Sequence, residues 1–349
     1  PGVSASSAWR YLQYCTHAPP TCSPLVSKDS TGAPVCHRTA KSCAAAFRRC
    51  FAEKKPTVDL PYPPPLPPGP DPDCPKVLVW EVMSAIRSLA AAGAPDESGI
   101  SPKLVLALAD VLAPLFAQAI DTVLRTGIPI PELWKQSVFI PIMKALRPPD
   151  EIDSYRPVAL IALLCRLMEK VVYQRLLSEV NPKLSFQQFG FRERLMTHDV
   201  LAYVVKMAKE GFAKGVEVAV TGPELGRRGR RRNFRFAETL VALVDLSDAF
   251  SRVPHALILE RLVKFGVSAY ITRFVHEWLR DRKGRVFHDG VRSEWVRLLA
   301  GVPQGSVLGP RTLGVAETLK RCRSALRMTC HCSSKESTVR PLETRCRSC

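Results

Sequence analysis

The spacing of apolar residues changes along the chain, and each change predicts a different element of secondary structure. Between residues 77 and 144 the spacing is helical, with one amphipathic face that ends near Gly93. A second helix is predicted over residues 104–124, and its near-continuous Leu, Val and Ala content favours burial. Residues 138–142 follow with a short apolar run that is typical of a strand.

Residues 240–244 are apolar and rich in β-formers, so they predict a buried strand that ends at Asp245. A carboxylate is costly to bury unpaired, so Asp245 should be exposed, hydrogen-bonded or bound to a metal. An ordinary loop aspartate is the alternative. The other predicted elements are a helix over residues 201–209, a helix between Pro254 and Gly266, a helix over residues 271–279, and a hairpin about Asp289-Gly290.

The N-terminal part of the chain is marked by cysteine and proline. Residues 1–55 hold five cysteines without a C-x₂₋₄-C pair, which favours incidental thiols over a zinc site, and residues 44–54 predict a short basic helix. Residues 56–76 are dense in proline and predict an extended, poorly packed linker. A spacer is favoured over a ligand for SH3-type domains.

Charge narrows the class of partner. Lysine and arginine number 50 against 32 acidic residues, which gives a net charge of +18 and suits a polyanion or an anionic membrane surface. No uninterrupted run of about 18 apolar residues occurs, so no membrane span is predicted. The chain begins at Pro1 without a methionine or a signal-peptide pattern, which suggests a fragment. At this length the 12 cysteines favour reduced thiols in an intracellular protein.

Two stretches carry the candidate chemistry. Residues 245–255 read DLSDAFSRVPH, and residues 301–310 read GVPQGSVLGP, where glycines and a proline around Gln304 indicate a tight turn. Together they resemble the first two palm motifs of the reverse transcriptases of non-LTR (LINE-type) retrotransposons. Residues 152–173 and 188–192 are similar to further segments of that family.

The resemblance implies an α+β fold, with right-hand polymerase fingers, a partial antiparallel palm and no thumb. The implied domains are an N-terminal cysteine-containing extension over residues 1–55, the proline-rich linker over residues 56–76, fingers and partial palm over residues 77–310, and a basic tail over residues 311–349.

The resemblance also implies the activity of an RNA-directed DNA polymerase, a nucleotidyltransferase that uses two Mg²⁺ ions held by oxygen ligands. Its partners would be an RNA template, a DNA primer and deoxynucleoside triphosphates, and no protein partner can be inferred. Asp245 is the implied catalytic residue and would bind metal together with the backbone carbonyl of Leu246. The residues implied in nucleotide binding are Lys144, Arg156, Asp248, Ala249, Phe250, Gln304 and Gly305, and those implied in template binding are Gln188, Gly190 and Arg192. A solvated lysine, a salt-bridged arginine and a core phenylalanine are the plainer alternatives for Lys144, Arg156 and Phe250.

Two segments depart from the family pattern. Residues 218–236 form a basic insertion, predicted to be a solvated loop, with nucleic-acid clamping or nuclear import as the alternative. Residues 290–349 contain no aspartate and therefore no third motif, [YF]-x-D-D. We expect a degenerate, disordered tail, as a frameshift would produce, and an inactive truncated polymerase that would be nuclear if functional. A non-catalytic, basic nucleic-acid-binding remnant is the alternative.

Overall fold

The structure, a computed structural model, describes most of the chain between residues 25 and 312. The described residues are 25–28, 32–54, 56, 61–62, 73–93, 95–190, 192, 194–213, 216–219, 232–235 and 249–312. By its internal contacts the chain divides into two units. The first unit comprises residues 1–191 and 246–323, and the second comprises residues 192–245 and 324–349.

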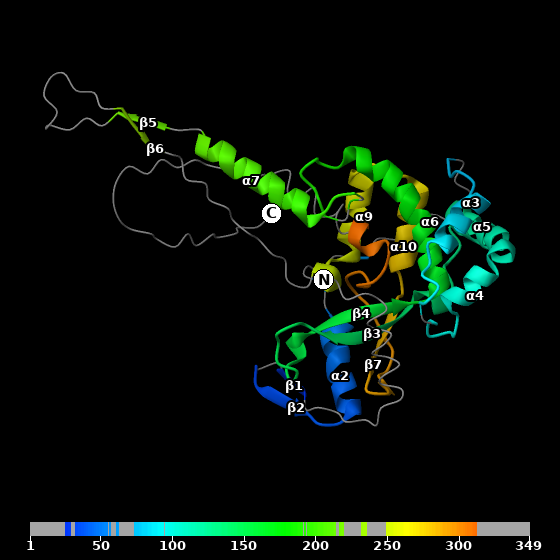
Figure 1. The fold of residues 1–349 in the computed structure, drawn as a ribbon. Helices are drawn as coiled ribbons and strands as arrows, with labels where there is room; N and C mark the ends of the chain where they lie inside the picture. The colour runs from blue at the N-terminus through cyan, green and yellow to red at the C-terminus, as the bar shows by residue number, and fades with distance from the viewer. Residues whose placement is uncertain are drawn as a thin grey trace, which may run out of the picture. The chain divides into compact units, whose positions relative to one another are not determined.

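A five-stranded sheet organises the first unit (Figure 1). Its strand order is β4-β3-β7-β8, and β9 pairs with β7. The strands are β3 (Gln136–Met143), β4 (Tyr155–Ile161), β7 (Lys283–His288), β8 (Val291–Arg292) and β9 (Val296–Arg297).

The described sheet is mixed rather than purely antiparallel. Strands β3 and β4 are antiparallel, because a short connection joins them, with Ile142 opposite Arg156. Strands β3 and β7 are parallel, since several helices separate them along the chain. The predicted palm strand at residues 240–244 lies outside the described residues.

One face of the sheet packs on a helix from the N-terminal part of the chain. Helix α2 (Ala40–Phe51) lies against this face in Figure 1, and the buried ring of Phe47 contacts the rings of Tyr155 and His288 at 5.0 Å each. Strands β1 (Leu25–Lys28) and β2 (Pro34–His37) form a hairpin beside it. Residues 40–51, which the sequence analysis places in an N-terminal extension, therefore pack on the sheet. The reason is the apolar stripe of α2, which is buried only by packing on the sheet.

Helices, including two over residues 163–180 and 249–252 that the sequence analysis does not predict, pack at the other end of the first unit. They are α3 (Val79–Arg87), α4 (Pro102–Ala107), α5 (Ala109–Thr126), α6 (Leu163–Val180), α8 (Ala249–Arg252), α9 (His255–Lys264) and α10 (Ala269–Leu279), with 3₁₀ turns η1 (Glu132–Lys135), η2 (Ile152–Ser154) and η3 (Asn181–Lys183). The single helix predicted over residues 104–124 is two helices, α4 and α5, which meet at Leu108.

The predicted burial of this segment is wrong on one side. Leu104, Leu108, Val111 and Leu115 are 45–63% exposed. The buried stripe of α5 lies elsewhere and includes Ala113, Ala117, Ile120 and Leu124. A helix that packs through one stripe leaves the opposite side in solvent even where its residues are apolar.

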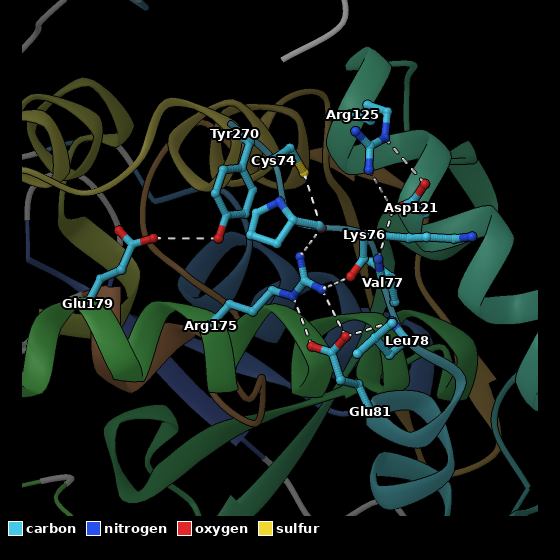
Figure 2. A network of polar contacts seen from close by, with 11 residues as sticks. Cys74, Lys76, Val77, Leu78, Glu81, Asp121, Arg125, Arg175, Glu179 and Tyr270 are labelled. Carbon is cyan, nitrogen blue, oxygen red and sulfur yellow. Dashed lines mark hydrogen bonds and ion pairs between the residues drawn. The ribbon is translucent and has the colours of Figure 1, made fainter. Parts of the chain in front are cut away.

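An arginine on α6 holds the chain where it enters α3 (Figure 2). The guanidinium of Arg175 donates to both carboxylate oxygens of Glu81 at 2.8 and 2.9 Å, and to the carbonyl oxygens of Pro75 and Lys76 at 2.7 and 2.9 Å. The Val77 amide donates to Asp121 on α5 at 2.8 Å. The end of the proline-rich segment, predicted to be poorly packed, is therefore bonded to α6, and the residue that follows it is bonded to α5.

The second unit contains helix α7 (Thr197–Ala213), which includes the helix predicted over residues 201–209, and an antiparallel pair, β5 (Val216–Ala219) and β6 (Arg232–Arg235). The flanks of the predicted basic loop thus pair as strands, with Val218 opposite Asn233. Residues 220–231 and the tail from residue 313 lie outside the described residues. Within the described ranges, no helix is both long and apolar enough to cross a bilayer.

Candidate functional site

The two signature stretches of the sequence meet in the first unit. The amide of Val302 donates to the carbonyl oxygen of Phe250 at 2.6 Å, and the amide of Gly301 donates to that of Val253 at 2.8 Å. Phe250 lies on the short helix α8 and is half-buried against the core. The first and second motifs therefore form one continuous backbone junction.

Gly301 is required at this junction for two reasons. Its φ is +76°, which side chains other than glycine rarely adopt. A Cβ atom at this position would lie 2.3 Å from the carbonyl oxygen of Phe250 and 2.5 Å from the Cα of Ser251. The two stretches can approach this closely only because residue 301 has no side chain.

The other side of the turn docks on the free edge of β4. The amide of Ala159 donates to the carbonyl oxygen of Gln304 at 2.8 Å. Gly305, at φ +132°, approaches so closely that a Cβ atom would lie 2.6 Å from the carbonyl oxygen of Ala159. Because β4 is the last strand of the sheet among the described residues, this contact occupies backbone groups of β4 that no described strand pairs with. Gln304 is half-buried and Gly305 is exposed.

Lys144 and Arg156 lie near the same end of the β3–β4 pair. Arg156 is exposed on β4 opposite Ile142, and the amide of Lys144 donates to Ser154 at 2.7 Å just beyond the end of β3. Arg156 therefore lies within the ladder of β3 and β4, and Lys144 lies one residue past the end of that ladder. The ammonium of Lys144 donates to the carbonyl oxygen of Asp153 at 2.6 Å. Arg156 and Gln304 thus both belong to the β4 edge.

The remaining predicted site residues lie at or beyond the ends of the described ranges. Asp245, Leu246 and Asp248 lie outside the described residues, and Ala249 begins α8. Gln188 and Gly190 belong to the first unit, where Gly190 is exposed with open space around it, whereas Arg192 belongs to the second unit. Among the described side chains, no group of three or more His, Cys, Asp or Glu could hold a metal ion.

The comparisons with known proteins agree with the motifs. The family described as "Reverse transcriptase (RNA-dependent DNA polymerase)" matches residues 144–332, more than half of the chain. The chain belongs to this family. It is 32% identical over 242 residues to the "RNA-directed DNA polymerase from mobile element jockey" of Drosophila melanogaster, an alignment that covers 68% of this chain and 24% of the relative.

Two further relatives place this reverse transcriptase among the LINE-type, non-LTR polymerases. The jockey polymerase of Drosophila funebris is 29% identical over 67% of this chain and 23% of its own length. The "Probable RNA-directed DNA polymerase from transposon BS" of Drosophila melanogaster is 27% identical over 72% of this chain and 26% of its own length. The chain thus spans about a quarter of the length of these relatives. The family match continues past residue 310, where the recognisable motifs end, and begins later than residue 77.

The reverse transcriptase site contains a buried histidine that the sequence motif included without a role. His255 is 4% exposed, and its Nε2 donates to the carbonyl oxygen of Gly301 at 2.8 Å. The ring of Tyr62, from the proline-rich segment, packs edge-on against it at 6.0 Å. Burial, opposed by the hydrogen bond to Gly301, lowers the pKa of His255 to about 4. The neutral imidazole is therefore the form that supports the junction.

Acid should weaken this junction. The pKa of His255 is about 4 in the folded chain and 6.5 for a histidine in water, so the unfolded state takes up the proton first as pH falls. The neutral histidine contributes its full stability above pH 6.5, and up to about 3 kcal/mol is lost between pH 6.5 and 4. Urea unfolding at several pH values measures this loss, and His255→Gln should flatten it. His198→Gln, at an exposed position on α7, is the control; equal flattening in both variants would contradict the assignment.

Proposed function

We propose that residues 1–349 form the fingers and part of the palm of an RNA-directed DNA polymerase, and that they bind an RNA template, a DNA primer and a deoxynucleoside triphosphate. We assign no thumb within these residues. The observation that carries the proposal is the turn at Gln304, which is hydrogen-bonded both to Phe250 of the first motif, through Val302, and to Ala159 on the edge of β4. A turn held on two sides presents an ordered surface on which a nucleotide can be aligned.

The nucleotide-binding roles follow the positions of the side chains. Arg156 is exposed on β4 and Lys144 lies just beyond the end of β3, and a forked guanidinium with a flexible ammonium suits a triphosphate. Phe250 would stack under the sugar and disfavour a 2′-hydroxyl, and Gln304 with Gly305 would border the templating base pair. Asp248 and Ala249 would offer backbone amides to the phosphates. Gln188, Gly190 and Arg192 would contact the template.

The metal site is a further part of the proposal. Asp245 and the carbonyl of Leu246 would hold Mg²⁺, whose preference for hard oxygen ligands they match in kind. Bound Mg²⁺ would stabilise negative charge on the attacking and leaving oxygens of phosphoryl transfer. No aspartate follows Asp289 in the sequence, so we infer that these residues alone supply too few carboxylates for efficient catalysis. If the chain functions in cells, we propose that it does so in the nucleus.

The absence of aspartate from residues 290–349 favours one alternative, a non-catalytic nucleic-acid-binding protein. The two functions differ in their response to nucleotide. Both predict binding to a primer–template through the net charge of +18, with affinity that falls as salt rises. Only a polymerase site predicts that the nucleotide complementary to the next template base strengthens this binding.

We expect a complementary deoxynucleoside triphosphate, with Mg²⁺, to tighten binding of a dideoxy-terminated primer–template by about tenfold. The reason is that the nucleotide would contact both the protein and the template base and would thereby stabilise their complex. Fluorescence anisotropy at fixed salt measures the two affinities. Arg156→Ala should abolish the nucleotide effect and leave most of the binary affinity, since one phosphate contact is removed. Arg147→Ala, at an exposed arginine in the connection between β3 and β4, is the matched control. Equal affinities with matched and mismatched nucleotides would favour the non-catalytic alternative.

A further inference from the structure

A glutamate on α6 lies at the centre of the first unit with its carboxylate surrounded by donors. Glu169 is 0% exposed. Its Oε2 accepts a hydrogen bond from the amide of Val307 at 2.7 Å and a weaker one from the amide of Leu308 at 3.5 Å. Its Oε1 accepts from the indole Nε1–H of Trp278 on α10 at 2.8 Å. Glu169 therefore connects α6, α10 and the second motif through one side chain.

Both oxygens act as acceptors, which suits a carboxylate rather than an apolar or amide side chain. A glutamine at this position could offer one oxygen, but its NH₂ group would face an N–H donor on the other side. Burial raises the pKa of the Glu169 carboxyl, and the nearby Arg282 opposes this rise. Such a group is costly to bury, and it is satisfied here because each oxygen has a donor.

Different contacts hold the two halves of the second motif, residues 301–310. The first half is held by two backbone hydrogen bonds, one from the Val302 amide to Phe250 and one from the Ala159 amide on β4 to Gln304. The second half is bonded within itself, with the amide of Gly309 donating to the hydroxyl of Ser306 at 3.0 Å. Glu169 is the side chain that ties this second half to the helical core. Without it, the Val307 amide would be a part-buried donor that has lost this acceptor.

We propose that Glu169 is a positioning residue of the nucleotide site. It would not touch substrate; it would set the orientation of the Gln304 turn, and through the turn the affinity for the incoming nucleotide. This inference rests on the proposed function. It also makes a separate claim, that the carboxylate of Glu169 protects the Val307 amide, which can be tested without any nucleotide.

The chain offers a matched control on the same helix. The carboxylate of Glu179 accepts a hydrogen bond from the backbone amide of Ser268 at 2.8 Å and also from the Ser268 hydroxyl. It thus performs the same chemistry as Glu169, but at the start of α10 rather than at the second motif. Glu179→Gln should cost stability in a similar way without disturbing the turn.

The experiment compares the full chain with Glu169→Gln and Glu179→Gln in two readouts. Amide exchange followed by mass spectrometry should rise at least about tenfold at residues 307–308 in Glu169→Gln only, since a hydrogen bond to a charged acceptor is lost. Affinity of the primer–template complex for the complementary nucleotide should fall about tenfold in Glu169→Gln, with the binary affinity for primer–template unchanged. Glu179→Gln should show neither effect.

Three results would overturn the proposal. One is unchanged protection at residues 307–308 in Glu169→Gln. Another is a loss of nucleotide affinity of the same size in both variants, and the third is a loss of binary and nucleotide affinities together. If the unsubstituted chain shows no nucleotide response, the proposed function fails, and exchange alone decides whether Glu169 holds the turn. If Glu169→Gln does not fold, the unsubstituted chain decides: slow exchange at Val307, comparable with α6, supports the proposal, and fast exchange overturns it.

Discussion

Replacing Gly301 with alanine should destabilise the chain by about 3 kcal/mol or more and remove its response to nucleotide. Residue 301 has a φ of +76°, and an added Cβ atom would lie 2.3 Å from the carbonyl oxygen of Phe250. Neither strain can be relieved by rotating a side chain, because the atoms that collide belong to the backbone. The turn would have to move away from α8 and would break the bond between Val302 and Phe250. Urea unfolding and the anisotropy assay measure the two consequences.

Gly99→Ala is the matched control for this substitution. Gly99 has a similar φ of +80°, but no atom lies within 4 Å of the position that a Cβ would occupy. Its replacement should therefore cost only the backbone strain, about 1 kcal/mol, and leave the nucleotide response intact. Equal losses in the two variants would mean that the close approach at Gly301 contributes nothing and that the junction between the motifs is looser than the structure shows.

Local signals in the sequence were sufficient for many elements. The helices α3, α9 and α10 lie where the spacing of apolar residues predicted them. The hairpin about Asp289-Gly290 is confirmed, with φ of +46° and +75° at these two residues. These features succeed because a short stretch contains the whole cause, whether an apolar face of a helix or the backbone preference of a turn.

Local sequence patterns do not predict features that depend on residues far apart in the chain. The sequence pattern does not indicate the role of Glu169, because its donors lie more than 100 residues away and a glutamate within a helix ordinarily faces solvent. The packing of Phe47 on the sheet likewise requires knowing that residues 40–51 return to strands formed much later in the chain. Apolar content predicts burial for all of α4 and α5, but it does not identify which stripe of the two helices is covered.

The structure describes one part of the candidate site, and the other part is known only from the family resemblance. The glycines and the proline around Gln304 predict a tight turn, and the structure adds that Gly301 lets this turn approach the first motif closely. The carboxylate end of the site rests on resemblance, since Asp245 lies outside the described residues. Family membership is established by the match over residues 144–332, whereas the role of each side chain is a proposal.

Residues 1–349 should not extend a primer with deoxynucleotides in Mg²⁺, even at high protein concentration. Asp245 is the single carboxylate that corresponds to the catalytic set of the family, and no aspartate follows Asp289. A second metal ion would therefore have too few protein ligands. Electrostatic stabilisation of the transition state is commonly the largest contribution to such catalysis, so losing that stabilisation reduces the rate by orders of magnitude. Gel-based extension with a labelled primer on an RNA template measures this. Extension by the chain that is lost in Asp245→Asn would show that the residues after Pro310 supply the missing ligands.

The most direct test of the polymerase site supplies the missing carboxylates. A palm segment that carries the third motif of the family, [YF]-x-D-D, would be joined after Pro310, and primer extension would be measured for this chimera and for two variants of it. We predict that the chimera extends the primer, that Asp245→Asn abolishes extension, and that Gly301→Ala greatly reduces it because the turn no longer docks on Phe250. Two results would contradict the claim that residues 245–255 and 301–310 form part of a polymerase site. One is a soluble, folded chimera that binds primer–template but does not extend the primer, and the other is a chimera whose extension is unchanged by both substitutions.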